Sequence, residues 1–462
     1  MTRDGGAARA PRAGRADGPG GRAGGAGRPV VRALTLDGMF AAAARRHPDA
    51  VAVREGRRVL TYGRAEERAA RLASALVRYG LQLGDPVVVH CADHRQAVVA
   101  QLAVLKAGGV CVPVPPDVRG PAALRVSALT GARAVLCGGF ALPLWRHHEL
   151  VVDLDDAEVW RRVCALEPEP SLPHSASVDA AYLLVPAAEA NGYLTDHRAW
   201  QYHLSARVRA AGTAGQALTA TRGPGTPAAL SALWWAVAGG GTYVPWRPGL
   251  PVPAAGPAGA AGGRVGVFSP EEYARVLKAV RGGNGPRALE AARSAAGARH
   301  VRGSGAVPGG LPLATAVVLG GACPPELVAH HFDVLPGVRL RAEFAPAGGA
   351  LPWTARDLSP LADGDASGVG VGRALPHVRV WAVDGDGAPL PPGWVGELVA
   401  SGPAVPYESL RAGLLPPGDG GAEPMRSSWL GLRRADGRVE VTGRGGAHRA
   451  GAAPARQAVG AG

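Results

Sequence analysis

The chain has 462 residues, a formal net charge of +13 and 47% hydrophobic residues, enough for two or more domains or subdomains around a large core. No apolar run is long enough to span a membrane and no secretory signal is visible, so we expect a cytoplasmic protein with no membrane partner. Lys106 and Lys278 are the only lysines, and the other 50 − 2 = 48 basic residues are scattered arginines without a nucleic-acid-binding motif, which argues against nucleic acid as a partner.

Residues 1–32 contain seven arginines, two aspartates and otherwise mostly glycine, alanine and proline. A segment of this composition has too little apolar surface to fold, so the sequence predicts a disordered basic tail. One alternative is that the chain is a basic binding protein that acts through this arginine-rich tail on an acidic partner. Folded structure is expected to begin near Leu34.

From Leu34 onward, helices alternate with short valine-rich strands. A helical period of apolar residues runs from Ala65 to Val77, and Gly80 ends it. Further helices are expected over residues 39–45 and 97–106, and strands over residues 51–53, 59–62, 87–90, 110–114 and 133–137. This alternation predicts an α/β fold with a largely parallel sheet.

The same rhythm continues with strands at residues 182–185 and 316–319 and a helix at about 270–280. After residue 375 the pattern changes to strand, Gly-Asp-Gly turn and strand, and a second hairpin is expected around Asp436-Gly437. The sequence therefore predicts a small antiparallel β subdomain over about residues 375–443.

The stretch AYLLVPAAEANGYLTDHRAW, residues 181–200, has the order of a phosphate-binding loop: an apolar strand, a small-residue loop and a helix that begins near His197. The loop itself, residues 186–192, contains one glycine, no hydroxyl side chain and no lysine. From these residues alone, the segment could be a phosphate loop, a damaged one or an ordinary connection.

The five cysteines, at positions 91, 111, 137, 164 and 323, form no Cys-x-x-Cys pair and no ligand spacing with histidine. We therefore expect no metal site. An odd number of cysteines with mostly apolar neighbours also fits a reducing cytoplasm.

Six segments, in matching order, resemble the adenylation domains of nonribosomal peptide synthetases, which belong to the adenylate-forming (AMP-binding) superfamily. The most specific is AVLKAGGVCVPVPPD (residues 103–117), which is similar to the family's LKAGGAYVPLDP segment. The others are LTYGRAEERAARLASALVRYG (60–80), AVVLGGACPPELV (316–328), RLRAEFAPAGG (339–349), GRALPHVRVWAVDGDGAPLPPGWVGELVASGPAV (372–405) and ADGRVEVTGR (435–444). Together they extend the resemblance over roughly residues 34–446.

The resemblance implies the large N-terminal domain of that superfamily over residues 33–443, with mostly parallel sheets flanked by helices, and then a residual hinge and disordered tail over residues 444–462. It implies an ATP- and Mg²⁺-dependent ligase that activates an amino acid or other carboxylic acid as its adenylate and passes it to a thiol, usually on a carrier protein. Because the sequence stops at residue 462, we expect the family's mobile C-terminal subdomain and its catalytic lysine to be missing.

The positions that should carry this chemistry depart from the family's pattern. The phosphate loop TSGSTGxPKG has become a shorter, proline-containing segment, in which Glu189 adds a negative charge where the triphosphate would bind. The other replacements are Asn191 for the loop lysine, Ala347 for a threonine hydroxyl, Gly348 for the metal-binding carboxylate, Trp429 for the ribose aspartate and Gly446 for the hinge aspartate. Neither lysine of the chain is placed to serve as the catalytic one.

Some residues still match the family and are candidates for a residual nucleotide site: Gly320, Gly321, Glu343, Phe344, Pro346 and Arg444. No catalytic residue, metal ligand or cofactor is expected, and ATP or AMP with Mg²⁺ would bind only if the family's activity survives. The sequence favours a catalytically inactive adenylation-like protein from secondary metabolism, with a carrier protein or other synthetase components as partners. The alternative is an active ligase with atypical motifs, or one completed by a partner chain.

Overall fold

The computed structural model describes residues 35–118, 120–169, 171–186, 191–220, 223–246, 263–283, 313–360, 369–408 and 424–445. The predicted basic tail, Glu189 of the expected phosphate loop and Gly446 of the expected hinge lie outside the described residues. The described strands form two hydrogen-bonded sheets, one of seven strands and one of thirteen.

The seven-stranded sheet has the order β18-β8-β7-β4-β3-β5-β6. Its centre is parallel, whereas β8 pairs antiparallel with both β7 and β18. All residues of β3, β4, β5 and β7 are buried, as expected for valine-rich strands that are covered on both faces. The strands are β3 (Pro86–His90), β4 (Val110–Pro113), β5 (Ala134–Cys137), β6 (Val151–Asp153), β7 (Ala180–Leu184), β8 (Tyr193–Asp196) and β18 (Tyr407–Glu408), and the connecting helices are α3 (His94–Lys106), α4 (Pro121–Thr130), α5 (Leu142–Trp145) and α6 (Ala157–Ala165).

The thirteen-stranded sheet has the order β16-β17-β19-β20-β15-β14-β13-β12-β11-β9-β10-β1-β2. The strands from β10 to β13 are parallel, and antiparallel pairing begins where β13 meets β14. The strands of the predicted β subdomain thus continue the large sheet. The strands are β1 (Val51–Glu55), β2 (Arg58–Thr61), β9 (Ala214–Thr219), β10 (Thr242–Pro245), β11 (Gly263–Phe268), β12 (Thr315–Gly320), β13 (Arg339–Phe344), β14 (Thr354–Leu358), β15 (Val369–Ala374), β16 (Arg379–Val383), β17 (Gly396–Ser401), β19 (Met425–Arg433) and β20 (Arg438–Arg444).

Helices cover the sheets, and several of them begin after a side chain that caps one of their first N–H groups. Thr35, Thr61 and Thr226 each accept a hydrogen bond from the backbone N–H three residues later, which satisfies one of the free donors at a helix start. The remaining helices are α1 (Leu36–Arg46), α2 (Tyr62–Arg78), α7 (His197–Ala211), α8 (Pro227–Ala238), α9 (Pro270–Gly283) and α11 (Pro325–Val334).

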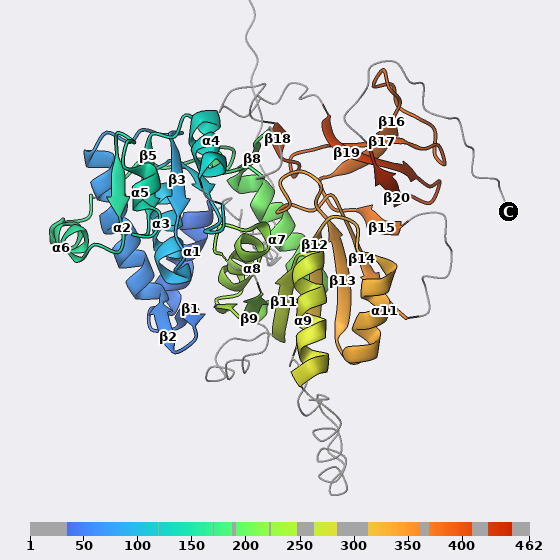
Figure 1. Cartoon of the computed structure of the whole chain (residues 1–462), viewed down its shortest axis with the longest axis horizontal. Coiled ribbons are helices and arrows are strands. Elements are labelled where there is room, and N and C mark those ends of the chain that lie inside the picture. The colour runs from blue at the N-terminus through green and yellow to red at the C-terminus, as the bar shows by residue number, and fades with distance from the viewer. Residues whose placement is uncertain are drawn as a thin grey trace, which may run out of the picture. The chain divides into compact units, whose positions relative to one another are not determined.

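Helix α7 lies between the two sheets (Figure 1) and joins distant segments through two buried histidines. At its start, His197 Nδ1 accepts a hydrogen bond from the backbone N–H of Leu36 at 3.0 Å. One turn and a half further on, His203 Nε2 donates to the carbonyl oxygen of Ala404 at 2.7 Å, beyond the end of β17. Burial lowers the pKa of both imidazoles to about 4, so both are neutral at pH 7.

The predicted fold class is confirmed: the chain is an α/β protein with a large mixed sheet and an antiparallel strand region. One predicted connection is wrong. The sequence predicted that the loop after β7 leads directly into a helix, but residues 193–196 form the additional strand β8, which returns antiparallel to β7. None of the described helices is long and apolar enough to cross a membrane.

Candidate functional site

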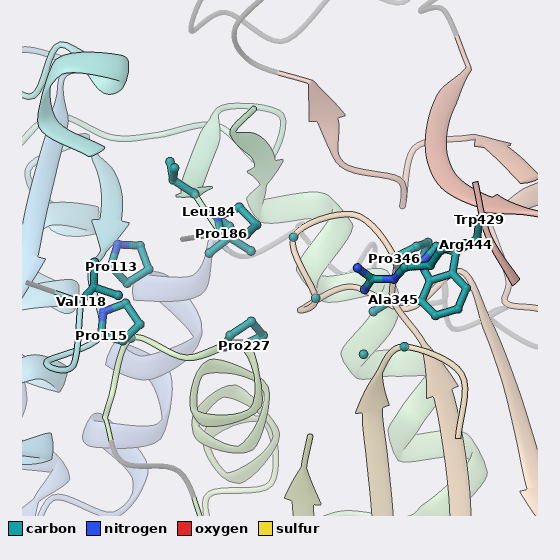
Figure 2. A pocket seen from close by; sticks show the side chains of 16 residues that line it. Pro113, Pro115, Val118, Leu184, Pro186, Pro227, Ala345, Pro346, Trp429 and Arg444 are labelled. Carbon is teal, nitrogen blue, oxygen red and sulfur yellow. The ribbon is translucent and has the colours of Figure 1, made fainter. Parts of the chain in front are cut away.

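A pocket of about 320 Å³ lies at the carboxyl ends of parallel strands from both sheets, next to the antiparallel strands β19 and β20 (Figure 2). Ligands of open α/β sheets bind at this end of the strands, so the pocket is the candidate functional site. Its lining residues are Pro113, Pro115 and Val118 after β4; Leu184, Val185 and Pro186 after β7; Gly225 and Pro227 at the start of α8; Gly320, Gly321, Ala345, Pro346, Gly348 and Gly349 after β12 and β13; and Trp429 and Arg444 from the antiparallel strands.

The segment that the sequence marked as a possible phosphate loop does border this pocket, through Leu184, Val185 and Pro186. It joins two antiparallel strands, however, so the N-terminus of α7 follows one strand later. That terminus is capped by Asp196, whose Oδ1 accepts from the N–H of Ala199 at 2.6 Å. Burial raises the pKa of Asp196 to about 6. The free N–H group of Ala199 at the helix start is therefore satisfied by the chain's own carboxyl group, and Asp196 does not line the pocket.

Gly348, which is predicted to stand where the family places its metal-binding carboxylate, lies in a tight turn with φ = +69°. A Cβ atom added there would lie 3.1 Å from Cβ of Tyr193 and 3.3 Å from two carbons of its ring. Both the left-handed backbone and the neighbouring tyrosine favour glycine. The preceding Ala347 is buried and offers no hydroxyl group.

Trp429, which the sequence comparison with the family's motif predicts at the place of the ribose aspartate, lines the pocket. Its ring meets Phe344 edge to face, with 5.6 Å between centroids and an interplanar angle of 82°. A Cβ atom at Gly321 would lie 3.4 Å from Cζ2 of Trp429, so the indole rests on glycine backbone. The Arg444 guanidinium carbon lies 4.8 Å from the Trp429 ring centroid. The indole thus fills space beside β12 that could otherwise admit a ligand.

Glu343, a predicted nucleotide-site candidate, is buried away from the pocket lining and tied to two arginines. Its carboxylate pairs with Arg207 of α7 and with Arg341 Nε at 3.0 Å. Arg207 Nη1 also donates to Ser231 Oγ at 2.6 Å, and its guanidinium carbon lies 5.0 Å from the ring centroid of Trp235. Burial alone would raise the pKa of Glu343, but the two guanidinium groups outweigh it and hold the pKa below its usual value. Glu343 is therefore ionised and fully engaged within the protein.

Of the other predicted nucleotide-site residues, most line the pocket and one lies in the core. Gly320, Gly321, Pro346 and Arg444 line the pocket. Phe344 is buried, meets the Trp429 ring edge to face and is not among the lining residues of the pocket. Among the described residues, no group of three or more His, Cys, Asp or Glu side chains is arranged to hold a metal ion.

Sequence reasoning missed the opposite wall of the pocket, which is built by prolines. Pro113, Pro115 and Pro227 line it from the end of β4 and the start of α8. The usable signal was their position: the VPVPP run directly follows a buried strand, and Pro227 opens a helix after a loop, both typical places for ligand contacts at a sheet edge.

A sequence-family model described as "AMP-binding enzyme" matches residues 40–198. The chain is 30% identical over 450 residues to phosphinothricin tripeptide synthetase PhsB of Streptomyces viridochromogenes, a match that covers 89% of this chain and 33% of PhsB. It is 28% identical over 431 residues to isonitrile lipopeptide synthase of Mycobacterium tuberculosis, which covers 90% of this chain and 15% of that protein. This chain thus spans a third or less of the length of these relatives.

Solved structures agree in fold. The nonribosomal peptide synthetase FmoA3 in an AMPPNP-bound form has a TM-score of 0.68 and 22% identity, covering 90% of this chain and 43% of that one. The N-terminal subdomain of Klebsiella oxytoca NpsA, in complex with 3-hydroxyanthranilyl-AMSN, has a TM-score of 0.65 and 18% identity, covering 89% of this chain and all of that one. At these identities the similarity shows the fold alone.

Proposed function

We propose that this chain, which belongs to the adenylate-forming (AMP-binding) superfamily, is an adenylation-like domain of the nonribosomal peptide synthetase type that does not itself form an acyl-adenylate. The observation that carries the proposal is the chemical character of the pocket. Among its described lining residues, Arg444 alone has an ionisable side chain, and none has a hydroxyl or carboxylate group.

Adenylate formation needs much more than one cation. Attack of a carboxylate on the α-phosphate of ATP develops charge on the phosphoryl oxygens and on the leaving pyrophosphate, and enzymes stabilise it with Mg²⁺ and preorganised donors. Mg²⁺ in turn prefers carboxylate oxygens among protein ligands. Removing one such donor typically lowers a rate by about 10²–10³-fold. Several of them are missing at once among the described lining residues, so the combined loss supports an inactive domain.

The packing around the pocket gives independent support, because the missing groups have been replaced by structure. Tyr193 lies against the α-carbon of Gly348, where a metal-binding side chain would have to start. Trp429 fills the place of the ribose aspartate and is supported by Phe344. Restoring one functional side chain would therefore meet steric resistance as well as the absence of the others.

For a domain that keeps this fold without its chemistry, we propose a structural role in a synthetase assembly, with a carrier protein or other synthetase components as partners. The support is the length of PhsB and of isonitrile lipopeptide synthase, of which this chain spans only a part. A further solved relative, NpsA-ThdA of Klebsiella oxytoca, is described as an artificially fused adenylation-PCP di-domain.

The proposal is tested by ATP–pyrophosphate exchange over a panel of amino acids and aryl acids, with a thermal-shift titration of the same protein against MgATP and AMP. We expect no exchange above background and no shift at millimolar nucleotide. An active adenylation domain, assayed in parallel, provides the positive control.

Exchange activity that remains after purification would contradict the proposal if the variant Arg444→Gln has less of it. The activity of a contaminating enzyme would not respond to a substitution in this chain. The alternative of a ligase completed by a partner chain makes a different prediction. Exchange should then appear only after co-expression with other synthetase components and should again depend on Arg444.

A further inference from the structure

The starts of helices α1 and α7 meet at His197, whose side chain is fully buried. Its Nδ1 accepts a hydrogen bond from the backbone N–H group of Leu36, the first residue of α1, at 3.0 Å. Because the first N–H groups of a helix have no partner within it, this imidazole caps α1 from a position 161 residues further along the chain. The first turn of α1 is thus held by a titratable side chain.

This hydrogen bond exists only while the imidazole is neutral. A neutral imidazole has one nitrogen that accepts and one that donates, and since Nδ1 of His197 accepts, the proton resides on Nε2. A protonated imidazole carries an N–H group on both nitrogens. The Nδ1–H group would then face the N–H group of Leu36, so that two donors would meet and the cap of α1 would be lost.

The surroundings of His197 also disfavour a positive charge. Its Nε2 atom is enclosed and has no hydrogen-bond partner among the described residues, and the ring lies at the N-terminal ends of two helices, which carry partial positive charge. Burial is the largest influence and lowers the pKa of His197 to about 4, although the carboxylates of Asp37 in α1 and Asp179 before β7 favour the charged form. The neighbouring Asp196 and Arg198 pair with each other.

Helix α7 itself does not depend on the protonation state of this imidazole. Its first three N–H groups have other acceptors, which are the carbonyl oxygens of Asp179 and Ser177 and Oδ1 of Asp196. Loss of the bond between His197 and Leu36 therefore loosens the start of α1 and leaves the start of α7 in place.

We propose that His197 is an acid-sensitive latch: its neutral imidazole holds the first turn of α1 on α7, and protonation of the imidazole releases that turn. No covalent bond changes, and the proton comes from solvent. Opening exposes the apolar side chain of Leu36 together with its N–H group, whereas the rest of α1 stays attached through Phe40, Ala43 and Ala44, which are buried in the main core. Because His197 does not line the pocket, the latch is independent of the proposed function.

The test is amide hydrogen–deuterium exchange of the full chain between pH 6 and pH 4, with each rate corrected for its intrinsic dependence on pH. The N–H group of Leu36 reports on the latch. The N–H group of Ala229 is the internal control, because it lies in the first turn of α8 and is bonded to Thr226 Oγ1 at 3.3 Å, an acceptor that does not titrate. A pKa of about 4 in the closed latch and 6.5 in the open one predicts that exchange at Leu36, relative to Ala229, rises roughly thirtyfold from pH 6 to pH 4.

Two variants locate the effect. Asparagine offers a side-chain oxygen near the position of the histidine Nδ1 and does not titrate, so His197→Asn should keep Leu36 protected at pH 6 and abolish the rise in acid. His203→Gln is the matched control, because His203 is a buried histidine of the same helix with a similarly lowered pKa but a different partner, Ala404. This variant should keep the full rise.

A ratio of Leu36 to Ala229 exchange that does not change with pH would overturn the proposal, and so would an equal rise in His197→Asn. Loss of the rise in His203→Gln would also overturn it, because a histidine other than His197 would then control the opening. If His197→Asn does not fold, the pH dependence of this ratio in the unmodified chain and in His203→Gln decides alone.

Discussion

Replacing Gly348 by glutamate would return a carboxylate to the position at which the family holds its metal, yet we expect it to destabilise the protein without restoring metal-dependent nucleotide binding. Gly348 has φ = +69°, a conformation that costs a residue with a side chain about 1–2 kcal/mol. The new Cβ atom would also lie 3.1–3.3 Å from three atoms of Tyr193. Overpacking of this kind adds about 1–3 kcal/mol, so the total loss should be about 2–5 kcal/mol.

A matched variant separates the two contributions. Gly56 has φ = +59° but no atom within 4 Å of an added Cβ atom, so Gly56→Glu should show the backbone cost of about 1–2 kcal/mol alone. The double variant Tyr193→Gly/Gly348→Glu should recover the difference relative to Tyr193→Gly, because the Tyr193 Cβ atom and both ring carbons that crowd the site are gone. Unfolding in urea, followed by tryptophan fluorescence, measures the unmodified chain and the four variants on one scale.

Two results would refute this reasoning. If Gly348→Glu is no more destabilised than Gly56→Glu, Tyr193 does not occupy the space that the carboxylate needs. If Gly348→Glu shows a Mg²⁺-dependent thermal shift with ATP, the site is only one residue short of function, and the account of several coordinated losses is wrong.

Two further predictions concern buried titratable groups. Glu343→Gln leaves the buried charge of Arg207 without the carboxylate that pairs with it and leaves Arg341 with Asp357 alone, so it should cost about 3–5 kcal/mol in urea unfolding. The exposed Glu326→Gln should stay within about 0.5 kcal/mol, and a small effect at Glu343 would show that the cluster is dispensable. Burial lowers the pKa of His203 from 6.5 to about 4, so the unfolded chain binds its proton first. The stability due to this neutral imidazole is present above pH 6.5 and is lost as the pH falls toward 4, at about 1.4 kcal/mol per pH unit. In His203→Gln the unfolding free energy should depend less steeply on pH by that amount over this range. An unchanged pH dependence would show that the reasoning is wrong.

Much of the fold could be predicted from the sequence because its signals are local. The apolar stripe of α2, which includes Ala65, Ala69, Leu72 and Leu76, is buried along its length as its helical period predicted. Strand β8 was missed for the opposite reason. Four residues of mixed polarity have no strand signal of their own, and they become a strand only because β7 and β18 supply hydrogen-bond partners on both sides.

The candidate site shows the same division. Residue types were sufficient to identify which functional groups had been replaced, as at Gly348 and Trp429. They were not sufficient for Glu343, which matches the family's motif but is bound by Arg207, because that partner reaches it only when α7 packs on β13. A matching residue indicates an ancestral position, and packing decides whether its side chain borders the pocket.

The sequence by itself thus predicted the α/β fold and the family, which are confirmed, and the loss of the phosphate-loop, metal and ribose side chains, which stays a prediction; all of these depend on local pattern and residue identity. Only the tertiary structure decided what fills their places. Tyr193 lies against Gly348, and Arg207 of α7 pairs with Glu343 of β13. Such contacts join segments that are distant in sequence, so they arise from close packing of the whole domain, to which no local pattern gives access.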